Sequence, residues 1–253
     1  MSSQPTSQAV ALGGRTLVIT RPASTAGTLV RQVCAHGGVP LRLPGLSLRT
    51  PDDAEAARDA LRRALAGDAL LFASPAAVRF AAALLPLRTC AAVFAVGRGT
   101  ALALRRHGLC TQAPDDRQDS EGLLALPSLR QVRGQRIALV GAPGGRGLLR
   151  EQLTVRGARV SEVHVYRRAP PRLDRRHVEA VLRLPADARV LLSSAEALHN
   201  LQNALPAPAW ARLRAAVAVA SSERIAALAR AAGFAQVRVA TSAFPCDLLA
   251  AAG

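Results

Sequence analysis

The chain repeats itself at a shift of about 120 residues. Residues 13–19, GGRTLVI, return as residues 134–140, GQRIALV, and Ser74 after an apolar run matches Ser194 after another. A duplicated unit of this size predicts two similar lobes, and two facing lobes would enclose a cleft. Catalytic clusters are harder to find, because no Ser-His-Asp, Cys-His or paired-carboxylate arrangement emerges from the spacing of residues. An enzyme of this kind would work mainly by holding a reactive substrate in shape.

Short apolar runs alternate with helical patterns in both copies. The runs are continuous, which is typical of strands covered on both faces. The expected strands are 16–20, 39–43, 69–73, 92–96, 137–140, 160–165, 189–193, 217–220 and 237–240. The expected helices include 29–36, 54–66, 100–107 and 225–232. Four glycines follow helical patterns where a left-handed C-cap is common, namely Gly37, Gly108, Gly157 and Gly233. This alternation predicts an α/β fold with doubly wound parallel sheets.

Short segments, mostly of small residues, follow the predicted strands, each just before a helix. They occur at Arg21-Pro22, Ser74-Pro75, Gly97, Gly141-Ala142, Ser193-Ser194 and Ser221-Ser222. Ligands of open α/β sheets bind at the carboxyl ends of the strands. The helix starts there offer free N–H groups and about half a positive charge, which suits carboxylates. The alternative is that these Ser and Gly residues are only N-caps and turns.

The composition favours a basic protein without a membrane span. Half of the residues are apolar, the net charge is +16, and all cationic side chains are arginine. The arginines reflect either a compositional bias or an anionic partner. Aromatic residues make up only 3% of the chain, so stacking platforms for nucleic acid would be scarce, and we expect none to bind. No apolar run is long enough for a membrane span. Residues 1–12 lack the features of a secretion signal and predict a disordered tail on a cytoplasmic protein.

Cysteines and histidines show no metal-binding pattern. Neither the four cysteines (Cys34, Cys90, Cys110 and Cys246) nor the five histidines have paired spacing. A disulfide frame or zinc site is therefore not expected, and we predict buried thiols in a reducing compartment.

Two further segments carry motif-like residues. Residues 141–147, GAPGGRG, follow a strand but lack the Lys-Ser/Thr of a phosphate loop and the spacing of a dinucleotide fingerprint. They predict a turn that could receive an anion. Residues 166–176 carry five arginines and paired prolines, which predicts an extended crossover between lobes. The only tyrosine, Tyr166, begins this crossover and serves either packing or catalysis.

Several of these segments together resemble the uroporphyrinogen-III synthase family along nearly all of residues 13–250. The matching stretches are VITRP at 18–22, FASPAAV at 72–78, AVGRGTAL at 95–102, DSEGLL at 119–124, VHVYRR at 163–168, LLSSAEAL at 191–198 and VASSER at 219–224. Each stretch is weak alone, but their order and spacing together are specific.

The resemblance implies two flavodoxin-like lobes joined by a two-stranded linker. It also implies that the lobes are not the tandem copies. One lobe would take 13–44 together with 168–253, and the other would take 45–167. Each repeat would then start in one lobe and finish in the other, whereas the repeat alone suggests contiguous lobes.

The resemblance also implies a reaction. The family closes the linear tetrapyrrole hydroxymethylbilane with inversion of its last ring, ring D, and yields uroporphyrinogen III and water. Loss of the hydroxyl leaves an azafulvene, which the substituted carbon of ring D attacks to give a spiro intermediate. The substrate is a polycarboxylate, which suits the arginine excess. The family needs no cofactor or metal, and we expect a monomer.

Site residues follow from the resemblance position by position. Tyr166 corresponds to the family's cleft tyrosine, which assists loss of the hydroxyl. The expected substrate-binding residues are Arg21, Ser74, Ala76, Ala77, Gly97, Thr100, Ser120, Ser194, Ser221 and Ser222. Where many relatives carry a side-chain donor, this chain has Ala73-Ser-Pro-Ala76, so contacts at Ala76 and Ala77 would come from the backbone.

Two other functions remain open from the residues alone. A non-catalytic module of the same fold could sense an anionic ligand, although no helix-turn-helix segment is left over after the two lobes. A nucleotide-dependent enzyme could use residues 141–147. Binding assays with hydroxymethylbilane and with nucleotides separate these functions from the synthase.

Overall fold

The computed structural model describes residues 11–115, 117–144 and 147–253. The chain divides into two compact units. Unit 1 contains Ala169–Gly253 and the described part of Met1–Ser47, and unit 2 contains Leu48–Arg168. The sequence analysis expected the divisions at 44/45 and 167/168. Unit 1 is therefore assembled from both ends of the chain, and a tandem repeat does not coincide with one unit.

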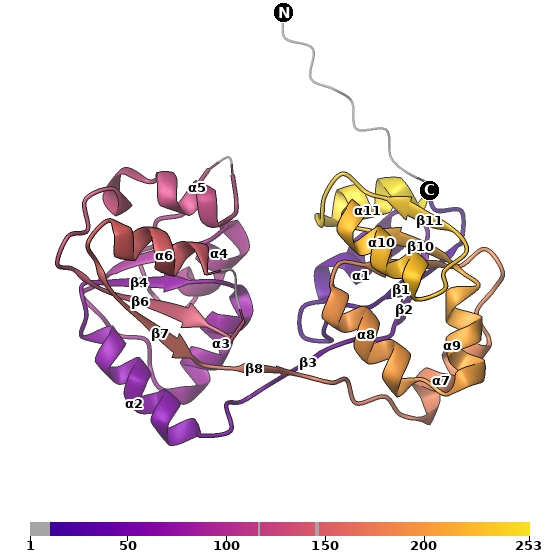
Figure 1. Ribbon diagram of the computed structural model, residues 1–253, viewed down its shortest axis with the longest axis horizontal. Coiled ribbons are helices and arrows are strands. Elements are labelled where there is room, and N and C mark those ends of the chain that lie inside the picture. Colours follow the sequence, from indigo (N-terminus) through magenta and orange to yellow (C-terminus); the bar gives the residue numbers. More distant parts are fainter. Residues whose placement is uncertain (1–10, 116, 145–146) are drawn as a thin grey trace, which may run out of the picture. The chain divides into compact units, whose positions relative to one another are not determined.

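Unit 1 is built on a five-stranded parallel sheet (Figure 1). In spatial order its strands are β11 (Val237–Val239), β10 (Val217–Ala220), β9 (Arg189–Leu192), β1 (Thr16–Ile19) and β2 (Val39–Arg42). Side chains alternate between the faces, as the strand period requires. Leu17 and Ile19 therefore face one hydrophobic core, while Val18 faces another.

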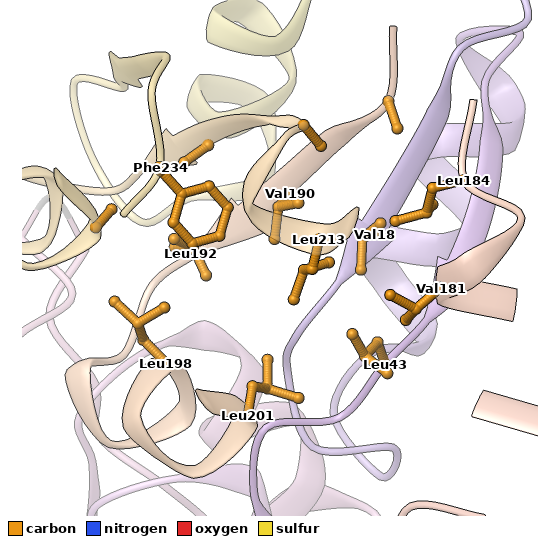
Figure 2. Close-up of a cluster of buried hydrophobic side chains, with 14 of the residues drawn as sticks. Val18, Leu43, Val181, Leu184, Val190, Leu192, Leu198, Leu201, Leu213 and Phe234 are labelled. Carbon is orange, nitrogen blue, oxygen red and sulfur yellow. The ribbon is translucent and has the colours of Figure 1, made fainter. Parts of the chain in front are cut away.

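Helices cover both faces of this sheet. The core of Leu17 and Ile19 is closed by α1 (Gly27–Ala35) and α11 (Pro245–Ala252). The core of Val18 is closed by α7 (Arg175–Leu182), α8 (Ala195–Ala204), α9 (Ala207–Arg214) and α10 (Glu223–Ala231). Figure 2 shows this second core, in which Leu198 and Leu201 of α8 extend toward Leu192 and Leu43. Burial on both faces explains why the central strands β1, β9 and β10 read as continuous apolar runs, whereas the edge strands β2 and β11 are partly exposed.

Unit 2 repeats the plan with a four-stranded parallel sheet. Its spatial order is β5 (Ala92–Ala95), β4 (Ala69–Phe72), β6 (Arg136–Gly141) and β7 (Arg159–His164). One core includes residues of α2 (Ala54–Leu65), α3 (Pro75–Leu84) and α4 (Arg98–Arg105). The core of the other face includes residues of α5 (Ser120–Ala125), the short 3-10 helix η1 (Pro127–Leu129) and α6 (Leu148–Val155).

Two short strands complete the fold. β3 (Ser47–Arg49) and β8 (Arg167–Ala169) pair with each other as a separate two-stranded sheet, and both unit boundaries fall within them (Figure 1). The family resemblance implied this linker. Local patterning does not identify it, because three residues are too few to show a periodicity.

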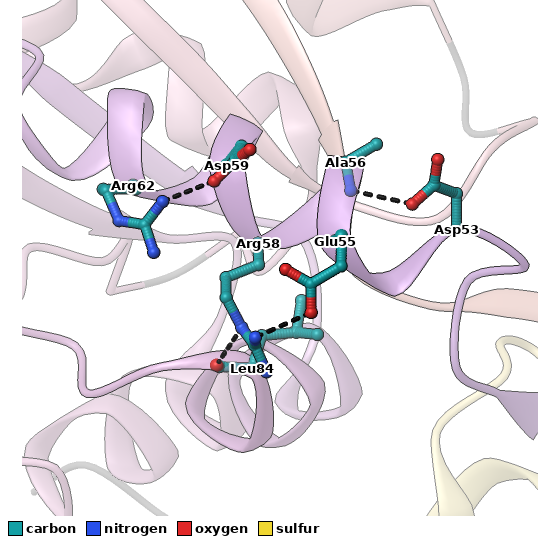
Figure 3. Close-up of polar contacts among 7 residues, drawn as sticks. All are labelled: Asp53, Glu55, Ala56, Arg58, Asp59, Arg62 and Leu84. Carbon is teal, nitrogen blue, oxygen red and sulfur yellow. Dashed lines mark hydrogen bonds and ion pairs between the residues drawn. The ribbon is translucent and has the colours of Figure 1, made fainter.

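Helix α2 illustrates how local sequence sets an element (Figure 3). The Asp53 side chain accepts a hydrogen bond from the Ala56 N–H at 2.8 Å and caps the helix start. Arg58 donates to Glu55 at 2.8 Å and to the Leu84 carbonyl of α3 at 3.1 Å. Leu61 lies in the core. Capping and the amphipathic pattern together define the helix.

The expected strands and helices are confirmed, with ends that shift by one or two residues. All four predicted C-cap glycines have positive φ, between 74° at Gly37 and 94° at Gly233. The left-handed conformation is readily available only to glycine. Among the described residues, no helix is both long enough and apolar enough to cross a membrane.

Two expectations from the sequence were wrong. The thiols of Cys34, Cys90, Cys110 and Cys246 are exposed rather than buried. Cys34 and Cys246 lie in the last turn of α1 and the first turn of α11, and Cys90 and Cys110 lie outside helices and strands, so the fold leaves all four side chains in solvent. The predicted tail, 1–12, ends too late: residues 1–10 lie outside the described residues, but Leu12 is fully buried in the core beneath α1. Its N–H also donates to the His36 carbonyl at 2.9 Å.

Candidate active site

The candidate site in unit 2 lies at the carboxyl edge of its sheet. Because β4, β5, β6 and β7 are parallel, the residues that follow them share one edge. Ser74 follows β4, Gly97 follows β5, Gly141 ends β6 and Tyr166 follows β7. A pocket of about 120 Å³ near this edge is lined by Ala73 and Gly141, among others, but its lining does not include Ser74, Gly97 or Tyr166. Three predicted site residues are thus brought to the edge where α/β sheets bind ligands.

Tyr166 is anchored in the unit 2 core and is only 7% exposed. Its ring stacks on Phe80 of α3, with ring centroids 5.3 Å apart and planes inclined by 18°. Its hydroxyl lies 3.3 Å from the Ser74 hydroxyl. The ring therefore packs while the oxygen reaches a polar helix start, so the two roles that the sequence left open for Tyr166 are compatible.

Ser74 is the N-cap of α3. Its Oγ accepts a hydrogen bond from the Ala77 N–H at 3.1 Å. This bond uses one of the two backbone donors that the sequence analysis assigned to substrate. Pro75 has no N–H, which leaves the Ala76 N–H as the remaining backbone donor of this first turn. Both Ala76 and Ala77 are buried.

The turn between β5 and α4 is filled by a side chain from the following loop. Gln118 accepts a hydrogen bond from the Arg98 N–H at 3.1 Å, and its Oε1 would lie 3.0 Å from a Cβ added at Gly97. A side chain at this position would require Gln118 to shift by a few tenths of an ångström. Thr100 is 4% exposed, and its N–H donates to the Gly97 carbonyl at 3.0 Å. Thr100 therefore lies inside the first turn of α4.

Ser120 begins α5 beside a carboxylate. Asp119 caps this helix by accepting a bond from the Gly122 N–H at 2.8 Å, and Arg117 donates to Asp119 at 2.6 Å. Desolvation opposes the charged form, but these hydrogen bonds and the Arg117 charge lower the pKa of Asp119 below its usual value. The anion position at this helix start is thus taken by the protein itself.

The carboxyl edge of the unit 1 sheet carries the cation Arg21. It follows β1, and its Nη2 donates to the Ala243 carbonyl at 2.5 Å. Burial lowers the pKa of the Arg21 guanidinium, although an arginine remains charged in proteins. The adjacent Thr20 is a structural residue, since its buried hydroxyl donates to the Leu191 carbonyl at 2.7 Å.

Two of the three predicted serines of unit 1 are helix caps. Ser194 follows β9 and accepts from the Ala197 N–H at 3.2 Å, and Ser222 follows β10 and accepts from the Ile225 N–H at 3.4 Å. The Ser221 N–H donates to the Leu192 carbonyl at 2.9 Å. A capping serine still carries a hydroxyl hydrogen, so it can donate to a carboxylate while its oxygen caps the helix.

Two residues of the unit 2 site were missed by the sequence analysis. Phe80 supports the Tyr166 ring, and Gln118 fills the α4 turn. Phe80 had one available signal, its position within the first two turns after the Ser74-Pro75 helix start. Gln118 had no such signal in the sequence, because only the fold brings its side chain to the Arg98 N–H. No group of three or more acidic, histidine or cysteine side chains that could hold a metal occurs in the part of the chain that the structure describes.

Comparison with known proteins identifies relatives over most of the chain. The family model described as uroporphyrinogen-III synthase HemD matches residues 27–250. The uroporphyrinogen-III synthase of Salmonella typhimurium is 34% identical, over 90% of this chain and 95% of the relative. That of Escherichia coli is 32% identical, over the same shares of both chains.

Solved structures share the fold. A mutant uroporphyrinogen III synthase from Thermus thermophilus superimposes with a TM-score of 0.55 at 23% identity, covering 93% of this chain and 96% of its own. The uroporphyrinogen-III synthetase of Helicobacter pylori gives a TM-score of 0.59 at 14% identity, covering 93% of this chain and 98% of its own. With a family model that spans 27–250 and relatives above 30% identity, the chain belongs to the uroporphyrinogen-III synthase family.

Proposed function

We propose that this hydro-lyase of tetrapyrrole biosynthesis closes hydroxymethylbilane with inversion of ring D, giving uroporphyrinogen III and water. Family membership carries the enzyme class. What we propose beyond the enzyme class is the substrate, hydroxymethylbilane, and the role of each site residue. The observation that carries it is the Tyr166 hydroxyl, held at the carboxyl edge of a parallel sheet beside a helix start.

The first step breaks the bond between carbon and the terminal hydroxyl. Tyr166 donates its phenolic proton as the hydroxyl leaves as water, and the pyrrole nitrogen supplies the electron pair that forms the azafulvene. The substituted carbon of ring D then attacks this carbon and gives the spiro intermediate. The bond between this substituted carbon and the methylene of the preceding ring then breaks, and that methylene bonds to the free α-carbon of ring D instead. Loss of the proton from this α-carbon restores the pyrrole, now inverted, and returns a proton to the Tyr166 phenolate. Tyr166 is suited to the first step because a hydroxyl whose ring is packed on Phe80 and whose oxygen contacts Ser74 is oriented before the substrate arrives.

Carboxylate recognition falls to the strand-end donors of each unit. The proposed substrate-binding residues are Arg21, Ser74, Ala76, Ala77, Gly97, Thr100, Ser120, Ser194, Ser221 and Ser222. The contacts of these residues in the structure suit some of them better than others for binding a carboxylate. Arg21 carries a partly buried positive charge, and Ser194 and Ser222 keep a hydroxyl hydrogen after capping. Thr100 is buried, and Asp119 already occupies the helix start at Ser120.

The decisive experiment resolves the product isomers. Purified protein is given hydroxymethylbilane, and the type III and type I products are separated after oxidation to porphyrins. Unaided closure gives type I, so an excess of type III measures the enzyme's control of substrate shape. A chelator-treated sample should give the same type III yield, because no catalytic step requires a metal. Metal-dependent rescue of lost activity would contradict this expectation.

The same experiment distinguishes the alternative function of ligand sensing. A sensing module of this fold would bind the tetrapyrrole without changing the type I to type III ratio. Binding with an unchanged ratio would therefore overturn the proposed function and favour the sensor.

A further inference from the structure

The ring of Tyr166 packs on Phe80 of helix α3, and its hydroxyl contacts Ser74, the N-cap of the same helix. Phe80 stacks against the ring at 5.3 Å between centroids, and the guanidinium carbon of Arg79 lies 4.8 Å from the centroid of the Phe80 ring. Offset or parallel stacking of this kind restricts the tilt of both rings. The plane of the tyrosine, and with it the direction of its C–O bond, is therefore set from within unit 2.

The Ser74 hydroxyl stands between the Tyr166 oxygen and the start of α3. Its oxygen accepts the Ala77 N–H at 3.1 Å and lies 3.3 Å from Tyr166 Oη. A serine hydroxyl has one hydrogen and two lone pairs. With one lone pair engaged by the helix, its hydrogen can be donated to Tyr166 Oη, and donation is strengthened when the oxygen itself accepts a hydrogen bond. Tyr166 then keeps its own hydrogen for the substrate.

We propose that Ser74 is a positioning residue for Tyr166 rather than a ligand of the substrate. Ser74 holds the phenolic oxygen at the N-terminus of α3 and donates to it, which directs the phenolic hydrogen toward the departing hydroxyl. Phe80 fixes the ring plane from the same helix. This inference rests on the proposed role of Tyr166 in the reaction, and it reassigns Ser74 from the set of substrate-binding residues.

The internal repeat supplies a matched control. Ser194 is the counterpart of Ser74 and caps α8 in the same way, accepting the Ala197 N–H at 3.2 Å. The chain's only tyrosine is near Ser74, so Ser194 has no tyrosine to position. Ser74→Ala and Ser194→Ala therefore remove equivalent caps, and we expect similar decreases in melting temperature. Only Ser74→Ala removes the contact to Tyr166.

The structural test reads Tyr166 directly. Protein labelled with ¹³C at the tyrosine ζ-carbon gives a single signal, because the chain has one tyrosine. The chemical shift of this carbon responds to hydrogen bonding at its oxygen. We expect Ser74→Ala to move the signal and Ser194→Ala to leave it in place, with Ser74→Thr restoring it. An unmoved signal in Ser74→Ala overturns the proposal, whatever the role of Tyr166 in catalysis. Should Ser74→Ala fail to fold, Ser74→Gly takes its place, since glycine is tolerated at N-caps.

The kinetic test separates positioning from binding. Ser74→Ala should lower kcat about ten- to a hundredfold with a change in KM below about threefold, because an oriented donor acts in the transition state. In a Tyr166→Phe background the same substitution should have little further effect, since the two residues act through one interaction. An undiminished effect in that background, or a rise in KM alone, would make Ser74 a substrate ligand and overturn the inference. If Tyr166→Phe alone keeps the parent rate, the proposed role of Tyr166 fails, and the ¹³C signal still reports whether Ser74 positions it.

Discussion

At the scale of single residues, the proposed chemistry depends most on Tyr166. Its ring is buried, and its phenolic oxygen lies 3.3 Å from the Ser74 hydroxyl. Tyr166→Phe keeps the stacked ring and removes that oxygen. We expect kcat to fall roughly ten- to a thousandfold, as for loss of one positioned acid or oxyanion donor. Steady-state assays with hydroxymethylbilane measure this decrease.

The same variant needs a control for folding. Because the Phe80 stack is retained, its melting temperature should stay near that of the parent, and residual type III formation should persist through substrate shaping. Phe80→Leu is a useful comparison, since it leaves the Tyr166 hydroxyl in place but removes its aromatic support. A parent-like rate for Tyr166→Phe would make the tyrosine a packing residue.

At the scale of elements, helix caps carry a measurable share of stability. Asp53 caps α2 through the Ala56 N–H, whereas Asp59 pairs only with the exposed Arg62 (Figure 3). Asp53→Ala should lower the free energy of unfolding by about 1 kcal/mol. Asp59→Ala, the matched control on the same helix, should change it by less than about 0.5 kcal/mol. Urea unfolding measures both, and equal losses would contradict the cap assignment.

The cap of α5 also makes stability depend on pH. Because the pKa of Asp119 is lowered in the folded chain, its charged form stabilises the fold above the unfolded pKa of about 3.9. That contribution is lost as pH falls through the lower, folded pKa. Asp119→Asn keeps a capping side chain without the charge. The variant should be less stable than the parent at pH 7, and the gap should close in acid.

Thermal melts across this pH range provide the measurement for Asp119→Asn. The parent should lose more stability than the variant between pH 5 and the acid limit, since only the parent has a carboxylate to protonate at the cap. A gap that stays constant at every pH would mean that ionisation of Asp119 does not contribute to the stability of the fold.

At the scale of the whole molecule, the net charge of +16 should draw in an anionic substrate. We expect kcat/KM for hydroxymethylbilane to fall as salt rises, because charges are screened beyond about 10 Å at 0.1 M ionic strength. The kcat at saturating substrate should change much less, which serves as the internal control. A kcat/KM that is indifferent to salt would assign the arginine excess to compositional bias.

Much of the fold could be predicted from the sequence. Apolar runs identified the nine strands of the two parallel sheets, and the glycines at Gly37, Gly108, Gly157 and Gly233 marked helix ends, because both signals arise from local conformation and burial. Within the candidate site, the strand-end positions of Ser74 and Tyr166 were also predictable. Parallel strands end at one edge of a sheet, so a residue's position just after a predicted strand is enough to place it at that edge.

The sequence by itself determined the elements, their parallel type and the edge at which the candidate residues gather. Only the tertiary structure decided which strands share a sheet, so that β1 pairs with β9 from the far end of the chain. It also decided that Tyr166 meets Ser74 and Phe80, that the thiols are exposed, and that Leu12 is buried. The physical reason is range: helix caps, turns and strand patterns arise from neighbours a few residues apart, whereas these contacts join residues many positions apart. Which residues meet in these contacts depends on how side chains pack in the two cores of each sheet. The sequence shows no hydrophobic periodicity from which this packing could be predicted.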